Sequence, residues 1–341
     1  MQLRVVAHPP LPLVSAGSVL LAELAGGLSV VTTQAEPHRL VRIPLGPGGR
    51  AWREPQALPL ESLQALTVCN DRLTIAGVAD DGSSTLVAIA EAGAAVVHRG
   101  EHPWRGPLLS LSLVCAAGKV EAIWQTQAQP SIVWWARLPG GEAVQAVETA
   151  SLADIALLGD EHGVLLAARD STGAALIRLV DGAPVRRAAV GEGHGHDVAV
   201  ARAGAEYVVA WSDSSWRTIE WQWFDQALTA LGPAAAAATS DGDERVEAPR
   251  FLSGATGLAL VYGRVQQTSA WASRDEDDRT EPIEERVPSI AVVDGAARLL
   301  GPALSIAGPL LAGGWMAGQL VVIHGSGPTV SVLAVDSPRG R

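Results

Sequence analysis

The chain has 341 residues and a formal net charge of −11; 48% of its residues are hydrophobic and only 18% are charged. This acidic balance argues against direct nucleic-acid binding, which needs a basic stripe, and against docking on an anionic membrane. No apolar run reaches the ~18 residues that a membrane span needs. With 11 tryptophans against two Phe and two Tyr, the sequence predicts a soluble, acidic, tryptophan-rich protein.

The N-terminal segment begins with one short predicted strand, LRVVA at 3–7. Arg4 is followed by the Pro-rich stretch HPPLP, and the next apolar run, SVLLAEL, is short and contains Glu23. This pattern differs from a secretory signal peptide, so we expect a cytoplasmic location.

Seven copies of one apolar strand, here called marker strands, follow at intervals of 43 to 62 residues. They are LSVVTTQ from Leu28, LTIAGVA from Leu73, VEAIWQT from Val120, VLLAARD from Val164, YVVAWSD from Tyr207, LALVYGR from Leu258 and LVVIHGS from Leu320. A repeat of this length is typical of propellers and solenoids.

Each repeat follows the same order of elements. An apolar run such as 63–69 and a tight turn such as 70–72 precede the marker strand, and a third strand such as 84–90 and a fourth such as 93–99 follow it. Short strands separated by turn residues indicate an all-β fold. Several marker strands are apolar on both faces, which indicates that sheets pack against both sides.

These units predict a single domain over 1–341, a seven-bladed β-propeller of four-stranded antiparallel blades. The last repeat lacks a fourth strand, and the N-terminal strand at 3–7 can supply it. The ring would then close without an open edge.

Two segments break the repeat period and are predicted to be inserted loops. The first is 233–250, and the second, 266–289, is long, acidic and Pro-containing. Loops of this length are usually either functional or disordered, and both readings stay open.

The two cysteines, Cys69 and Cys115, each end the strand before a marker strand. We interpret them as small buried apolar residues in a reducing compartment. A disulfide between adjacent repeats stays open, because the sequence does not give the Cα separation that it requires.

The stretch YVVAWSDSSWRTIEWQWFDQALTALGP at 207–233 has a "VVAWSD" strand followed by a strand that ends in a "D…LG" hairpin. In this stretch and in its overall repeat, the chain resembles bacterial seven-bladed β-propellers. The resemblance implies the fold and names no activity. The recurring signatures of WD and kelch repeats and the sialidase-type Asp box are absent.

The last three positions of the marker strands vary, whereas the first four are mostly aliphatic. In a propeller these strand ends reach one face, where they would form a rosette suited to a protein hot spot or a small ligand. The predicted binding residues are Trp124, Trp211, Tyr262, His324, Arg169, Asp170, Asp213 and Arg264. The alternative is that the aromatic rings only fill space between blades.

Two loops contain residues that could bind a divalent cation. His194, His196 and Asp197 lie in GEGHGHD, and they would need further ligands from elsewhere in the chain. Asp241 and Asp243 lie in TSDGDE, which partly resembles a calcium-binding loop. No other cofactor is expected.

No nucleophile elbow, phosphate-binding loop, zinc-protease helix or dinucleotide motif is present. We therefore predict a non-catalytic binding or scaffolding propeller that binds a protein partner or larger complex through one face. The alternatives are a propeller that binds or hydrolyses glycans, through Trp platforms and paired carboxylates, and a metal-dependent hydrolase or lactonase-like propeller. A small ligand or glycan also fits this prediction.

Overall fold

The computed structural model of the chain describes residues 5–7, 19–24, 27–34, 39–46, 54–58, 60, 62–78, 84–90, 95–99, 108–126, 131–149, 154–170, 173–191, 195–254, 257–273, 280–293, 303–306, 308–316, 319–325 and 331–336. All regular elements in these residues are β-strands. Within this part of the chain, no helix is long and apolar enough to cross a membrane.

Hydrogen bonds group the described strands into seven four-stranded antiparallel sheets, numbered here by the order of their marker strands. The first contains β2 (Val19–Leu24), β3 (Gly27–Gln34), β4 (Arg39–Leu45) and β5 (Gln56–Ala57). The second contains β6 (Ser62–Cys69), β7 (Arg72–Val78), β8 (Ser84–Ala90) and β9 (Ala95–Arg99). The third contains β10 (Leu108–Ala116), β11 (Lys119–Thr126), β12 (Ser131–Leu138) and β13 (Val144–Thr149).

The remaining sheets follow the same strand order. The fourth contains β14 (Ile155–Asp160), β15 (Gly163–Asp170), β16 (Gly173–Val180) and β17 (Ala183–Val190). The fifth contains β18 (Gly195–Ala203), β19 (Glu206–Asp213), β20 (Thr218–Phe224) and β21 (Ala235–Thr239). The sixth contains β22 (Arg245–Gly254), β23 (Gly257–Ser273), β24 (Thr280–Val293) and β25 (Leu304–Ser305). The seventh contains β26 (Leu310–Met316), β27 (Gln319–His324), β28 (Ser331–Asp336) and β1 (Val5–Ala7).

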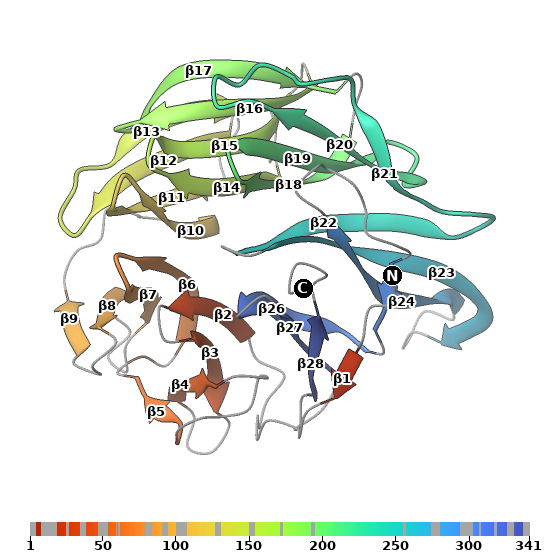
Figure 1. Ribbon diagram of the computed structural model, residues 1–341, viewed down its shortest axis with the longest axis horizontal. Helices are drawn as coiled ribbons and strands as arrows, with labels where there is room; N and C mark the ends of the chain where they lie inside the picture. The colour runs from red at the N-terminus through yellow and green to blue at the C-terminus, as the bar shows by residue number, and fades with distance from the viewer. Residues whose placement is uncertain are drawn as a thin grey trace.

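The sheets have the arrangement of a β-propeller, with their first strands toward a common centre and their fourth strands outside (Figure 1). Each first strand contacts the first strand of the next sheet, from β2 through β6, β10, β14, β18 and β22 to β26, and β26 contacts β2. In the seventh sheet the outer strand is β1, which pairs antiparallel with β28 through Val6 and Ala334. The prediction of an all-β propeller built from four-stranded antiparallel sheets is confirmed.

Apolar side chains from consecutive sheets form the core. In the marker strand β15, Val164 and Leu166 pack in a cluster with the third sheet. Their neighbours Leu165 and Ala167 point to the other face and pack with the fifth sheet. Successive strand residues point to opposite faces, so a strand between two sheets is mostly apolar on both faces.

The prediction that both of these segments are inserted loops is wrong. Segment 233–250 forms the outer strand β21 and the start of β22. Its alanine run has low intrinsic strand propensity, but pairing with β20 and burial of Ala237 decide the conformation. Segment 266–289 extends β23 and β24 into a long hairpin, with Gln267 opposite Glu284 and Ser273 opposite Thr280. Residues 274–279, between the two strands, lie outside the described residues.

Cys69 and Cys115 form a disulfide, with a Cα–Cα distance of 5.1 Å. Our interpretation of them as separate buried apolar residues is therefore wrong. The bond joins the ends of β6 and β10, the first strands of neighbouring sheets. Beside it, the Asn70 side chain donates a hydrogen bond to the Gly118 carbonyl at 2.8 Å. A disulfide is typical of oxidising compartments, so the bond argues against the reducing compartment that the sequence favoured.

Candidate functional site

The aromatic residues predicted to form a rosette are buried. Trp124, Trp211 and Tyr262 are 2%, 5% and 3% exposed. Trp124 stacks on Trp134 with ring centroids 6.4 Å apart, and the Trp211 indole donates a hydrogen bond to Glu220 at 2.9 Å. These rings therefore pack between sheets, and they do not form the exposed aromatic surface that the sequence predicted.

The strand period explains this burial. The fifth position of a marker strand shares its face with the first and third positions, because side chains alternate with a period of two. That face packs on the preceding sheet: Tyr262 clusters with Leu258, Leu260 and residues of the fifth sheet such as Val208 and Ala210. The same period was readable in the sequence and would have predicted the burial.

The other predicted rosette residues have separate environments. The Asp213 carboxylate accepts hydrogen bonds from the backbone N–H groups of Arg217 and Thr218, at 2.8 and 3.0 Å, and closes the turn after β19. Burial alone would raise the pKa of Asp213, but hydrogen bonds from Ser215 and from these backbone groups outweigh it and lower the pKa. Arg264 forms an ion pair with Glu244 at 2.5 Å.

His324 is partly buried and lies opposite Leu310 in the β26–β27 pair. Arg169 and Asp170 end β15, and their side chains lie outside the described residues. The structure therefore does not bring the eight predicted residues together as one described site.

The predicted metal ligands do not converge in the described part of the chain. His194 and the His196 side chain lie outside it. Asp241 and Asp243 are exposed in the turn before β22. Among the described residues, no group of three His, Cys, Asp or Glu side chains could hold a metal ion. Asp197 has a different role, as part of a cavity wall.

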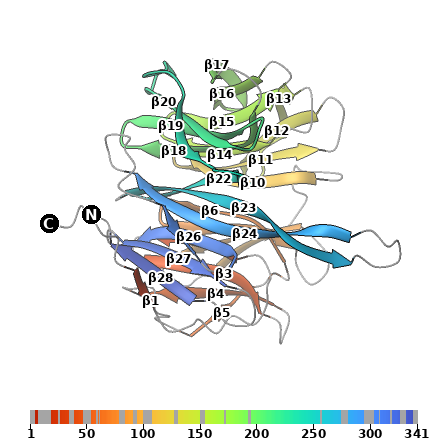
Figure 2. The ribbon, with the colours of Figure 1, turned by 90° about the vertical axis from the view of Figure 1, so that its right-hand side faces the viewer.

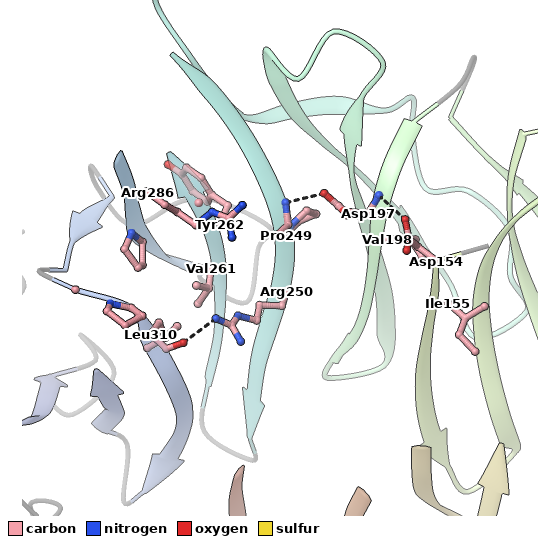
Figure 3. A pocket seen from close by; sticks show the side chains of 15 residues that line it. Asp154, Ile155, Asp197, Val198, Pro249, Arg250, Val261, Tyr262, Arg286 and Leu310 are labelled. Atoms are coloured by element: carbon pink, nitrogen blue, oxygen red, sulfur yellow. Dashed lines mark hydrogen bonds between the residues drawn. The ribbon is translucent and has the colours of Figure 1, made fainter. Parts of the chain in front are cut away.

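A cavity of about 590 Å³ lies where the marker strands of the fourth to seventh sheets end (Figure 3). Its lining includes Ile155, Val198 and Leu310, which pair with the fifth marker positions Ala168, Trp211 and His324. Tyr262, the fifth position of the sixth sheet, also lines it. The cavity is thus at the face that the sequence selected, but its walls come mainly from the first strands.

Bulges in the first strands shape this cavity. The β18–β19 register shifts between His196 and Val198, and the β22–β23 register shifts between Glu247 and Arg250. The bulged residues Asp197 and Ala248 have left-handed φ values of 43° and 50°. A bulge re-aims the neighbouring side chains, and such irregularities are common beside functional sites.

Hydrogen bonds connect the two bulges with each other and with Asp154, the residue before β14. The Ala248 N–H donates to the Asp197 carboxylate at 2.9 Å, and the Asp197 N–H donates to the Asp154 carboxylate at 3.3 Å. Each carboxylate therefore positions the backbone of the next sheet while lining the cavity.

Two arginines contribute positive charge to the cavity lining. Arg286 forms an ion pair with Glu247. Arg250 donates a hydrogen bond to the Leu310 carbonyl at 3.1 Å and has no carboxylate partner among the described residues. Surrounding protein lowers the pKa of the Arg250 guanidinium below its ordinary value because the charged form is partly desolvated.

Sequence reasoning missed Asp154, Arg250 and Arg286, and it assigned Asp197 to a metal site. The available signal was topological: the start of a first strand lies beside the end of the marker strand with which it pairs. Applied to each repeat, this rule selects residues near Asp154, Asp197 and Arg250, but it does not give the bulges that aim them.

No known protein family matches the chain, and no curated protein matches it at a significant level.

Proposed function

We propose that the seven sheets are the blades of one closed ring formed by a single domain. The contacts of β26 with β2 and the pairing of β1 with β28 support closure. A closed ring gives a rigid body without an open sheet edge.

We propose further that this propeller is a non-catalytic binding or scaffolding protein whose partner docks on the face where the marker strands end. The observation that carries the proposal is the cavity, which is formed at this face by strands of four consecutive sheets. Rigid scaffolds with a specialised concave rim are suited to recognition.

The β23–β24 hairpin supports a protein partner. It continues the strand that carries Tyr262 and extends far beyond the other sheets (Figure 2). Past Val265, which pairs with Arg245 of β22, the described part of β23 pairs only with β24. Segment 266–286 contains seven Asp or Glu and three Arg residues. An acidic projecting arm suits a partner with a basic surface.

The described cavity does not favour the two enzymatic alternatives. Two carboxylates, Asp154 and Asp197, and no tryptophan line it. A glycan site would be expected to have a Trp platform and more convergent acids.

The test is a shortened hairpin in which a two-residue Asn-Gly turn joins Gln267 to Glu284. These residues are paired in register, so a two-residue turn is compatible with the hairpin and should preserve the fold. Affinity purification from the native host, followed by mass spectrometry, should show a partner captured by the full chain and lost with the shortened one.

A Val185→Ser variant serves as the control, because Val185 is 59% exposed on the outer strand β17, which does not line the cavity. It should capture the partner as the unmodified chain does. Equal capture by the full and shortened chains would contradict a binding role for this face.

A further inference from the structure

The polar groups of the cavity are separated by charge. Figure 3 shows the Arg250 guanidinium and the carboxylates of Asp154 and Asp197 on opposite sides of the strand that carries Pro249 and Arg250. A ligand in this cavity therefore meets a cationic group at one end and anionic groups at the other.

Arg250 retains donors for a ligand. A guanidinium has five N–H donors in a planar fork that matches a carboxylate. One bond from Arg250, to the Leu310 carbonyl, is present in the described structure. A charge-assisted hydrogen bond from Arg250 to a ligand carboxylate is stronger than a bond between neutral groups.

Asp154 and Asp197 retain acceptors. One carboxylate oxygen of each accepts a backbone N–H, from Asp197 and Ala248 respectively. A carboxylate has two oxygens and about four lone-pair sites, so each can still accept bonds from an ammonium group. The same two negative charges would repel a multiply charged anion such as phosphate.

Apolar side chains also line the cavity. Ile155, Val198, Val261, Pro309 and Leu310 contribute to the lining. Small-ligand sites of roughly 300–1,000 Å³ are typically apolar with a few placed polar groups, and a volume of about 590 Å³ falls in this range.

We propose that the cavity binds a small extended zwitterion, an ω-amino acid in which an apolar chain separates the carboxylate, held by Arg250, from the ammonium group, held by Asp154 and Asp197. This inference goes beyond the proposed protein-binding role, because it concerns a ligand that the purified chain binds without any partner.

The experiment is a thermal-shift screen of the purified full chain against unbranched ω-amino acids of increasing chain length, followed by calorimetric titration of each that raises the Tm. A ligand that binds only the folded state raises the Tm. We expect at least one chain length to bind, and α-amino acids such as leucine to bind weakly because their two charges lie on one carbon. For 6-aminohexanoate the matched probes are hexanoate, which lacks the amine, and hexylamine, which lacks the carboxylate; each should bind at least tenfold more weakly. Inorganic phosphate should not bind.

Two variants test the assignment of the polar groups. Arg250→Gln and Asp154→Asn should each weaken binding by roughly tenfold or more, as expected for loss of a charged hydrogen bond. Arg186→Gln, an exposed arginine on β17, is the matched control and should bind as the unmodified chain does. If Arg250→Gln does not fold, Asp154→Asn still decides the test.

The proposal is overturned if no ω-amino acid binds the unmodified chain, if the carboxylate or the amine alone binds as tightly as the ω-amino acid, or if the folded variants retain full affinity. This assay contains no protein partner. A negative result would therefore overturn the ligand proposal but would not affect the proposed protein-binding role, which the shortened hairpin tests.

Discussion

Two tryptophan rings pack directly against glycine backbones of an adjacent repeat. Trp135 covers Gly182, where a Cβ atom would lie 2.7 Å from the ring, and Trp211 covers Gly191, where it would lie 2.5 Å away. The indole N–H groups donate to the buried or partly buried carboxylates of Glu121 and Glu220, at 2.6 and 2.9 Å. The abundance of tryptophan therefore reflects packing between blades at these positions.

Gly191 offers a matched test of this packing. Its φ of +63° is close to the +66° of Gly204, but a Cβ at Gly204 would meet nothing within 4 Å. Alanine at either position carries the left-handed backbone cost of roughly 1–2 kcal/mol. Gly191→Ala should lose about 1–3 kcal/mol more because the methyl group overpacks against Trp211.

The measurement is urea unfolding of both variants, monitored by tryptophan fluorescence. Equal losses of unfolding free energy for Gly191→Ala and Gly204→Ala would show that the ring moves away without cost, contrary to this prediction.

At the scale of strands, the Cys69–Cys115 disulfide joins the first strands of two neighbouring sheets. It connects the last residue of β6 with β10, across 46 residues of sequence. The cross-link limits the unfolded chain, and the chain-entropy relation for a loop of this length gives about 4 kcal/mol at 25 °C. The neighbouring Asn70–Gly118 hydrogen bond adds a second connection between the same two sheets.

Reduction should therefore lower the thermal stability of the protein. We expect the paired Cys69→Ser and Cys115→Ser variant, and the unmodified chain in dithiothreitol, to melt several degrees lower than the oxidised chain. Adding dithiothreitol to the double variant should change nothing. If the reduced and oxidised unmodified chains melt at the same temperature, the disulfide does not stabilise the fold.

At the scale of the whole molecule, β1 joins the two ends of the chain in one sheet. It brings the N-terminal segment to the seventh sheet, whose other three strands come from the end of the chain. Without β1, the N–H and C=O groups of β28 that face it would lose their partners and leave an edge for association between molecules.

Deletion of residues 1–7 should lower the Tm and make the protein self-associate at concentrations at which the full chain is monodisperse. Differential scanning calorimetry and light scattering measure the two effects. A synthetic peptide of residues 1–12 added in trans should restore part of the lost stability. A deletion variant with unchanged Tm and size would contradict the proposed closure of the ring.

Local signals in the sequence were sufficient for the strands. The predicted third strand at 84–90 coincides with β8, and the tight turn predicted to begin at Asn70 lies between β6 and β7. These predictions succeed because alternation, apolar runs and turn residues act over a few neighbouring residues. The hairpin over 266–289 was missed because its polar composition resembles that of a loop, whereas its strands are extended by pairing with each other.

The sequence by itself determined the repeat, the all-β class and the face at which the copies differ. Tertiary structure decided that Trp124, Trp211 and Tyr262 pack between sheets, and that Cys69 bonds to Cys115. It also placed Asp154, Asp197 and Arg250 around one cavity, from three different sheets. The physical reason is the range of the interactions. The apolar runs and turn residues that mark most strands act over a few neighbouring residues, but this cavity depends on bulges and on contacts between residues that are far apart along the chain.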